Sequence, residues 1–342
     1  MSDRLTILQG DALERLRELP DESVHCCVTS PPYWGLRDYG VAGQMGLERT
    51  PEEYVAKMVK VFREVRRLLR SDGTLWLNIG DTYANDGETG GKQAYLDDSN
   101  RKRVGREKRF TGLKAKDLSG MPWRLAFALQ ADGWWLRCDI IWHKSNPMPE
   151  SVTDRPTKSH EYIFLLAKSQ RYYYDAVAIR DPASPALVKQ VEEGYNGKAT
   201  KDYLGMGVQD ASATKARIIN GCRKRIDKQC GHSRRHAGFN EKWDKLSPAE
   251  QALLGRNKRD VWTVPAANFA EAHFATYPAD LIKPCILAGC PAGGVVLDPF
   301  AGSGTTGQVA LELGRRAVLI ELNPEYVKLI EQRCAVTPGL ML

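Results

Sequence analysis

The chain alternates between short apolar runs and longer stretches in which apolar residues recur at helical spacing. Residues 24–29 form a short apolar run that stops at a Ser-Pro-Pro sequence, which is typical of a buried strand ending in a loop. Residues 51–69 carry apolar side chains three or four positions apart, and Thr50 and Pro51 offer an N-cap and a first-turn proline. The same criteria predict further strands at 73–79, 135–142, 161–167, 294–297 and 317–322, and further helices at 122–130, 278–288, 305–313 and 324–334.

Alternating helices and nearly continuous apolar strands indicate an α/β fold, with a parallel sheet covered by helices on both faces. The pattern weakens after about residue 175, where Gly, Asn, Ser and basic residues dominate until about residue 259. We therefore expect one domain formed by residues 1–175 and 259–342, interrupted by an insertion at 176–258. Residues 85–119 are long, polar and Gly-rich, which predicts a mobile basic loop.

The positive charge is concentrated in two segments. The net charge is +7, yet residues 101–116 hold eight basic residues and one acidic residue, and residues 151–259 hold 21 basic and 12 acidic residues. Two basic segments on an otherwise acidic body favour a local surface for a polyanion, although solvated loops would show the same pattern. The basic residues expected to contact nucleic acid are Arg101, Lys102, Arg103, Arg106, Lys108, Arg109, Lys144, Arg223, Lys224, Arg225, Arg234 and Arg235.

Several classes of protein are disfavoured by composition. No run of 18 or more apolar residues is present, and the N-terminus lacks an apolar signal core, so a soluble, cytoplasmic protein is expected. The eight cysteines are spread along the chain, which favours reduced thiols. Cys222, Cys230, His232 and His236 lie close together, but their spacing does not match common zinc patterns, so no metal is predicted.

A glycine loop follows the strand predicted at 294–297. It contains Gly302 and Gly304 and leads directly into a helix, the arrangement that holds nucleotide-like cofactors at strand ends. Glu321 lies near the end of the next strand, where an acid can accept hydrogen bonds from ribose hydroxyls. No Gly-Lys-Ser/Thr follows, and the full dinucleotide pattern is absent. A cofactor with ribose but no pyrophosphate fits best, and S-adenosylmethionine is the first candidate.

A second loop, Ser30-Pro31-Pro32-Tyr33, follows the first buried strand. The prolines fix the backbone and remove two N–H donors, so the loop presents mainly acceptors. The Ser30 hydroxyl and the Pro31 carbonyl could each accept one N–H of an exocyclic base amine and aim its lone pair at a methyl donor. Tyr33 could stack on a base flipped out of a duplex. The alternative is a rigid turn with a buried aromatic residue.

With these two motifs in this order, the chain resembles the amino-group DNA methyltransferases of bacteria and their phages, in which the target-amine motif precedes the cofactor motif. The resemblance covers roughly residues 5–175 and 258–334. It implies a Rossmann-like methyltransferase fold with a seven-stranded sheet, S-adenosylmethionine as cofactor, double-stranded DNA as substrate and a target-recognition region at 176–258. It leaves open whether the protein forms a homodimer or acts beside a restriction endonuclease.

The resemblance also assigns residues. It implies that Asp11 contacts the cofactor's adenine amine and that residues 273–278 begin its methionine pocket, where Tyr277 replaces a lysine found in many relatives. Residues 140–144 resemble the strand beside the flipped base, although a simple turn explains the end of that segment equally well. The expected cofactor site consists of Asp11, Phe274, Pro278, Asp298, Phe300, Gly302, Ser303, Gly304, Thr305, Thr306, Glu321 and Asn323.

The target base is predicted from the first residue of the amine motif. Relatives with Ser at this position tend to modify cytosine N4, whereas those with Asp or Asn tend to modify adenine N6, so Ser30 favours cytosine N4. Adenine N6 methylation is the main alternative. An RNA or protein methyltransferase and an inactive DNA-binding module are the others. Pro284-Cys285 resembles the nucleophile dipeptide of cytosine C5 enzymes, but its helical context favours packing.

Overall fold

The computed structural model describes residues 4–36, 40–84, 112–192, 253–266 and 277–335 of the chain. The chain divides into two units. The first joins residues 1–172 to residues 260–342, and the second consists of residues 173–259. Within the second unit, α4 spans Pro185–Glu192, and an antiparallel bridge pairs Asp181 with Arg256.

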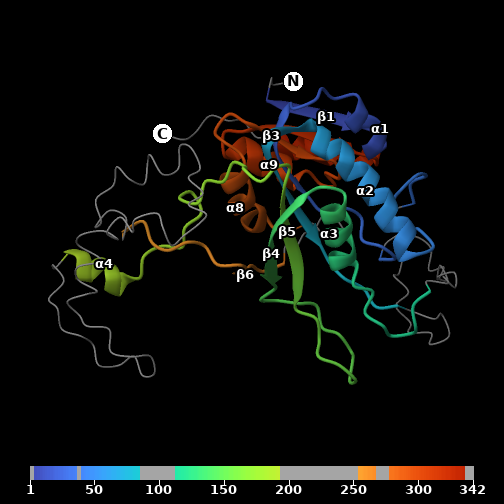
Figure 1. The fold of residues 1–342 in the computed structure, drawn as a ribbon, viewed down its shortest axis with the longest axis horizontal. Helices are drawn as coiled ribbons and strands as arrows, with labels where there is room; N and C mark the ends of the chain where they lie inside the picture. Colours follow the sequence, from blue (N-terminus) through green and yellow to red (C-terminus); the bar gives the residue numbers. More distant parts are fainter. Residues whose placement is uncertain (1–3, 37–39, 85–111, 193–252, 267–276, 336–342) are drawn as a thin grey trace. The chain divides into compact units, whose positions relative to one another are not determined.

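The first unit contains a mixed sheet (Figure 1). Among the described residues its strand order is β1–β8–β7–β2–β3–β5–β4–β6. The last strands of the chain therefore lie between the first two, so segments far apart in the sequence become neighbours. The strands are β1 (Leu5–Gln9), β2 (Val24–Thr29), β3 (Leu69–Ile79), β4 (Trp135–His143), β5 (His160–Ala167), β6 (Val261–Thr263), β7 (Val295–Asp298) and β8 (Arg316–Glu321).

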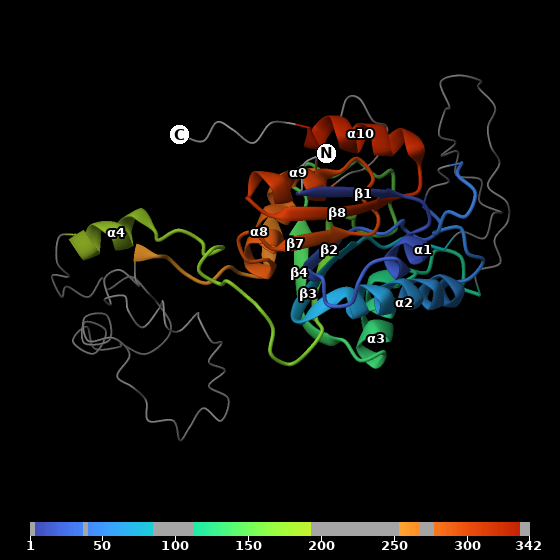
Figure 2. The ribbon, with the colours of Figure 1, turned by 90° about the horizontal axis from the view of Figure 1, so that it is seen from above.

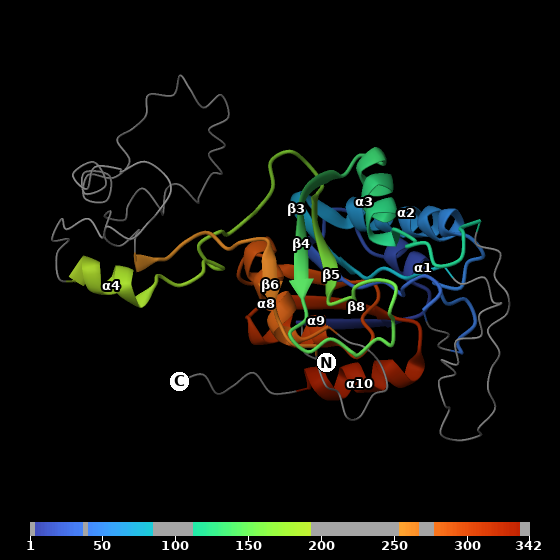
Figure 3. The ribbon, with the colours of Figure 1, turned by 90° about the horizontal axis from the view of Figure 1, so that it is seen from below.

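The predicted α/β fold is confirmed, but the prediction of a wholly parallel sheet is wrong at β5. This strand runs antiparallel to both β3 and β4, which lie on either side of it (Figure 3). An apolar strand reports burial on both faces and says nothing about direction. The resemblance implied seven strands, whereas eight are described. The additional short strand, β6, pairs with β4, and three residues are too few to show a pattern in the sequence.

Helices cover both faces of the sheet (Figure 2). Consecutive residues of β2 show the division, because Cys27 belongs to the core packed against α1, α2 and α3, whereas Cys26 faces Gly289 of α8. A Cβ on Gly289 would come within 2.9 Å of the Cys26 Sγ, so α8 lies very close to the sheet. The helices of this unit are α1 (Ala12–Arg17), α2 (Pro51–Leu68), α3 (Met121–Ala131), α8 (Ala279–Gly289), α9 (Thr305–Glu312) and α10 (Pro324–Cys334).

Local sequence signals account for several of these boundaries. Thr50 is the N-cap of α2, and its hydroxyl accepts a hydrogen bond from the Glu53 backbone N–H at 3.2 Å. Cys285 is buried in α8, which supports packing over a nucleophilic role. The six cysteines within the described residues are free thiols. Among the described residues, no helix is both long and apolar enough to cross a membrane.

Candidate active site

The two predicted motif loops meet at the carboxyl ends of neighbouring strands. β2 pairs with β7 in parallel, with Cys27 opposite Leu297, so the loops that follow these strands leave the same edge of the sheet. The Thr29 hydroxyl, immediately before Ser30, donates a 2.6 Å hydrogen bond to the Asp298 carboxylate at the start of the glycine loop. The sheet therefore brings together two motifs that lie 269 residues apart in the sequence.

Asp298 is the centre of a closed hydrogen-bond cluster. Its side chain is buried, and Oδ1 accepts from the Thr29 hydroxyl and, at 3.1 Å, from the Phe300 backbone N–H. Oδ2 accepts from the Thr306 hydroxyl at 2.5 Å and from the Tyr277 hydroxyl at 3.0 Å. Burial raises the pKa of Asp298, against the hydrogen bonds from Thr29 and Thr306, which lower it. Four donors occupy both carboxylate oxygens, so this side chain fixes the loop from within.

Tyr277 stands where the resemblance predicts a lysine in many relatives, and its contacts show what a tyrosine does at this position. Its hydroxyl contacts both Asp298 and Thr306, so it joins the start of α8 to the glycine loop. A lysine at this position would bring a charge to the buried carboxylate, whereas tyrosine brings a neutral donor. Pro278 follows as the N-cap residue of α8.

The glycine loop combines an open backbone with side chains that are held inside the protein. Gly302 has φ +52°, and a Cβ there would meet no atom within 4 Å, so the backbone is accessible from this side. Gly304 has φ +84° and is the N-cap residue of α9. The Arg333 guanidinium of α10 donates to the Ser303 hydroxyl at 2.6 Å and to the Thr305 hydroxyl at 3.3 Å. The predicted cofactor loop is therefore hydrogen-bonded to α10 through the side chains of Ser303 and Thr305.

Glu321 lies at the end of β8, beside the glycine loop. Its carboxylate accepts the backbone N–H of Gly302 and of Asn323, each at 2.8 Å. Burial raises the pKa of Glu321, and those two backbone N–H groups oppose the shift. The pairing of β1 with β8 and a 2.9 Å bond from the Gly10 N–H to the Glu321 carbonyl place Asp11 close by. Asp11 also caps α1 by accepting from the Glu14 N–H at 3.1 Å.

The two prolines of the target loop differ in the hydrogen bonding of their carbonyl groups. The Pro32 carbonyl accepts a 2.9 Å hydrogen bond from the Tyr54 hydroxyl of α2, which fixes the loop. The Pro31 carbonyl has no hydrogen-bond partner among the described residues. The Ser30 hydroxyl donates a long bond, 3.4 Å, to the Tyr33 hydroxyl. The two acceptors predicted for an amine, on Ser30 and Pro31, are thus both compatible with an incoming donor.

A second carboxylate, that of Glu161 near the start of β5, is hydrogen-bonded to the target loop. One of its oxygens, Oε2, accepts from the Tyr33 hydroxyl at 2.6 Å, and the other, Oε1, pairs with the Lys144 ammonium at 2.5 Å. The Asn78 amide of β3 donates to the same Oε2 at 3.3 Å. Gly80 permits this arrangement, because a Cβ there would come within 2.7 Å of the Tyr33 ring. Burial and Glu161 together raise the pKa of Tyr33 well above its ordinary value, so the phenol keeps its proton.

Sequence reasoning missed the residues that support the two loops. Glu161, Asn78, Tyr54 and Arg333 belong to no recognised motif, and each reaches the site from an element whose position depends on the fold. Only Asn78 left a trace in the sequence, as a polar residue inside an apolar strand. The predicted residues that lie outside the described residues are Phe274, Arg101, Lys102, Arg103, Arg106, Lys108, Arg109, Arg223, Lys224, Arg225, Arg234 and Arg235.

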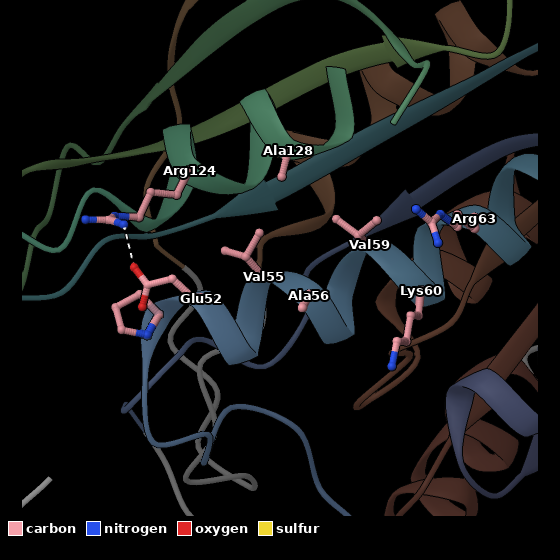
Figure 4. Close-up of a pocket in the computed structure, with 9 residues that line it drawn as sticks. Glu52, Val55, Ala56, Val59, Lys60, Arg63, Arg124 and Ala128 are labelled. Atoms are coloured by element: carbon pink, nitrogen blue, oxygen red, sulfur yellow. Dashed lines mark hydrogen bonds and ion pairs between the residues drawn. The ribbon is translucent and has the colours of Figure 1, made fainter. Parts of the chain in front are cut away.

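A hollow of about 560 Å³ lies between α2 and α3 and is separate from this site (Figure 4). Glu52 and Arg124 form an ion pair of 3.0 Å across one end of it. None of the predicted cofactor or target-loop residues lines it. Its lining residues are Pro51, Glu52, Val55, Ala56, Val59, Lys60, Arg63, Arg124 and Ala128.

Fold and site together define an α/β enzyme with an open glycine loop, an acid on the adjacent strand and an acceptor-rich loop beside them. The chain belongs to the DNA methylase family that comprises N6 and N4 enzymes, and the family's sequence pattern matches residues 24–332. The type II methyltransferase M.Cfr9I of Citrobacter freundii is 44% identical over 96% of this chain and 87% of its own length. M.SmaI of Serratia marcescens is also 44% identical, over 96% of this chain and 89% of its own length.

Solved structures show the same fold. The cytosine-N4-specific PvuII DNA methyltransferase superposes with a TM-score of 0.60 at 17% identity, covering 100% of this chain and 89% of that one. A putative DNA modification methylase of Thermus thermophilus, TTHA0409, solved in complex with S-adenosyl-L-methionine, superposes with a TM-score of 0.53 at 24% identity, covering 98% and 97%. These comparisons confirm the predicted family and fold, and they confirm the predicted enzyme as a DNA methyltransferase of the N4/N6 family.

Proposed function

We propose that this DNA methyltransferase transfers a methyl group from S-adenosylmethionine to the exocyclic N4 of a cytosine that is flipped out of duplex DNA. The observation that carries the proposal is the hydrogen bond between Thr29 and Asp298, which fixes Ser30 beside the glycine loop. Ser30 as the first residue of the target loop and the fold shared with a cytosine-N4-specific enzyme both favour N4.

The described residues fit S-adenosylmethionine, which supplies an electrophilic methyl group on a sulfonium. Each carboxylate oxygen of Glu321 accepts one backbone N–H and can accept one more hydrogen bond, which suits the two hydroxyls of a ribose. Gly302 leaves open space in front of the loop backbone. Asp11 lies next to this acid and can accept from an adenine amine. Phe300 and Pro278 would contribute apolar contacts, whereas Asp298 and Thr306 would hold the loop without contacting the cofactor directly.

The target loop would act on the amine through acceptors alone. The lone pair of an exocyclic amine is delocalised into the base, so two N–H hydrogen bonds that favour tetrahedral nitrogen raise its reactivity. Ser30 Oγ and the Pro31 carbonyl would accept these two hydrogens, while Pro32 anchors the loop through Tyr54. Tyr33 would stack on the flipped base. No covalent intermediate on the protein is required.

Contacts with DNA are proposed for the two basic segments of the sequence and for the insertion at 176–258, as the target-recognition region. Lys144 is the one proposed DNA contact within the described residues. Its ammonium pairs with Glu161 and lies 4.6 Å from the centre of the Trp142 ring. We therefore propose that Lys144 acts at the base pocket and not on the phosphate backbone.

The proposal is tested by incubating the purified protein with isotopically labelled S-adenosylmethionine and unmethylated bacterial DNA, followed by digestion to nucleosides and mass spectrometry. N4-methylcytosine is the expected product. N6-methyladenine would retain the acceptor chemistry and overturn the base assignment. Parallel incubations with RNA and with protein test the remaining alternatives, and label in either without label in DNA would overturn the proposed substrate.

A further inference from the structure

Glu161 anchors a chain of hydrogen bonds that ends at the proposed catalytic hydroxyl. The Tyr33 hydroxyl donates to Glu161 Oε2 at 2.6 Å, and the Ser30 hydroxyl donates to the Tyr33 oxygen at 3.4 Å. The side chain of Glu161 is only 15% exposed, and its second oxygen is paired with Lys144. These contacts join the loop after β2 to the facing ends of β4 and β5.

The direction of this hydrogen-bond chain follows from the chemistry of its members. A carboxylate accepts hydrogen bonds and cannot donate them, so Tyr33 must supply its only hydroxyl hydrogen in this contact. Asn78 Oδ1 is a second acceptor for the same hydrogen, but it is neutral and lies farther away, at 3.2 Å. With its hydrogen committed, the Tyr33 oxygen can only accept, which gives the Ser30 hydroxyl hydrogen a partner within the protein.

This direction matters because a serine hydroxyl can meet an amine either as a donor or as an acceptor. Only the acceptor orientation draws an N–H hydrogen toward Ser30 and frees the nitrogen lone pair for methyl transfer. We propose that Glu161 is a positioning residue that orients the Ser30 hydroxyl, through Tyr33, so that Ser30 Oγ faces the target amine as an acceptor. This inference rests on the proposed function and adds to it a residue outside the motif loops.

The test is a double-mutant cycle between Glu161 and Ser30, measured in single turnovers so that product release does not mask chemistry. We expect Glu161→Gln to slow methyl transfer by about 10- to 100-fold, below or at the lower end of the loss for a directly placed hydrogen-bond donor. In the Ser30→Ala background no hydroxyl remains to be oriented, so Glu161→Gln should cost less than about twofold. Tyr33→Phe should behave like Glu161→Gln in both backgrounds.

Two further measurements separate positioning from a general structural role. The melting temperature and the dissociation constant for S-adenosylmethionine, measured by calorimetry, should change little in Glu161→Gln. Glu64→Gln is the matched control. Like Glu161, Glu64 is partly buried and forms an ion pair with a basic residue, in its case Arg67 at 2.7 Å. It lies in α2 and takes no part in the hydrogen-bond chain that ends at Ser30. The variant should retain wild-type rates.

An effect of Glu161→Gln that persists fully in the Ser30→Ala background would overturn the inference, as would parallel losses of rate, stability and cofactor affinity. In both cases N4-methylcytosine in DNA treated with the wild-type protein would leave the proposed function intact. Absence of any methylated nucleoside from the wild type, despite bound cofactor, would instead overturn the proposed function and this inference with it.

Discussion

Two carboxylates, Asp298 and Glu161, stand beside the two loops of the site, and they are used in opposite ways. Asp298 is 1% exposed and accepts from four donors within the protein, so it locks the glycine loop to the end of β2. Glu161 is partly exposed, forms an ion pair with Lys144, and is connected to Ser30 by hydrogen bonds through Tyr33. The same chemical group thus builds the frame at one loop and orients reacting groups at the other. The difference lies in burial and in the partners: Asp298 is bonded only to groups that hold the glycine loop, whereas Glu161 is bonded to Lys144 and, through Tyr33, to Ser30.

The largest effect is expected at Asp298. Asp298→Ala removes the shared acceptor of the Thr29, Tyr277 and Thr306 hydroxyls, of which only Tyr277 and Thr306 also contact each other, and a buried polar group left unsatisfied costs about 1–3 kcal/mol. We expect a loss of about 3 kcal/mol or more in the free energy of unfolding, measured in urea, together with weakened cofactor binding. Asp72→Ala, at an exposed aspartate, should change stability by no more than about 0.5 kcal/mol. A stable variant would show that Asp298 does not frame the loop.

Ser30→Ala should slow methyl transfer without disturbing the hydrogen bonds that hold the glycine loop. Removing one of two proposed acceptors for the amine should lower the single-turnover rate by about 100- to 1000-fold, the range seen when one hydrogen bond to a developing charge is lost. The dissociation constant for S-adenosylmethionine should stay within about twofold, because the glycine loop and Glu321 are unchanged. Equal losses of rate and of cofactor affinity would contradict the acceptor role.

Glu321 combines a supporting role with a binding role. Each oxygen of its carboxylate accepts one backbone N–H and can accept one further hydrogen bond from a ligand. Glu321→Ala should weaken cofactor affinity by about 10- to 100-fold, corresponding to one or two hydrogen bonds to a charged group. Turnover at saturating cofactor should change much less, because such contacts are made equally before and during the reaction. Isothermal titration together with saturating kinetics separates the two quantities. An unchanged dissociation constant would remove Glu321 from the cofactor site.

The pH dependence of cofactor affinity sharpens the same assignment. Burial raises the pKa of Glu321, and the ionised form is the better acceptor for ribose hydroxyls. Binding should therefore be strongest above this raised pKa and weaken as the pH falls through it, beginning above the ordinary glutamate value of 4.5. Titrations of wild type and Glu321→Gln across pH check this, and a variant that keeps the full pH dependence would assign it to another group.

Tyr277→Phe should have the smallest effect. It removes one of the four donors to Asp298 and keeps the ring, so we expect a loss of about 1 kcal/mol of stability. Because the Thr306 hydroxyl still bonds to the same oxygen, methylation by the variant should remain close to wild type. Urea unfolding measures the first quantity and initial rates the second. A loss as large as that of Asp298→Ala would mean that Tyr277 is essential to the cluster.

Most of the helices and strands, and both motif loops, could be predicted from the sequence. Period and capping were enough to place α10 at Pro324–Cys334 and β2 at Val24–Thr29, because these signals act between residues close in the chain. Gly302, Gly304 and Glu321 were recognised because a loop that approaches a ligand closely demands particular residue types. The strand direction of β5 was not predicted, because burial on both faces looks the same in either direction.

The side chains that support those loops could not be predicted from the sequence, because they depend on how distant segments pack. The Thr29 hydroxyl lies 2.6 Å from the Asp298 carboxylate because β7 pairs with β2. Neither segment carries a local signal that predicts this pairing. Arg333 reaches Ser303 from α10, and Glu161 reaches Tyr33 from an antiparallel strand. A motif consists of a few adjacent residues, whereas the side chains that support it belong to strands and helices that become neighbours only when the sheet forms.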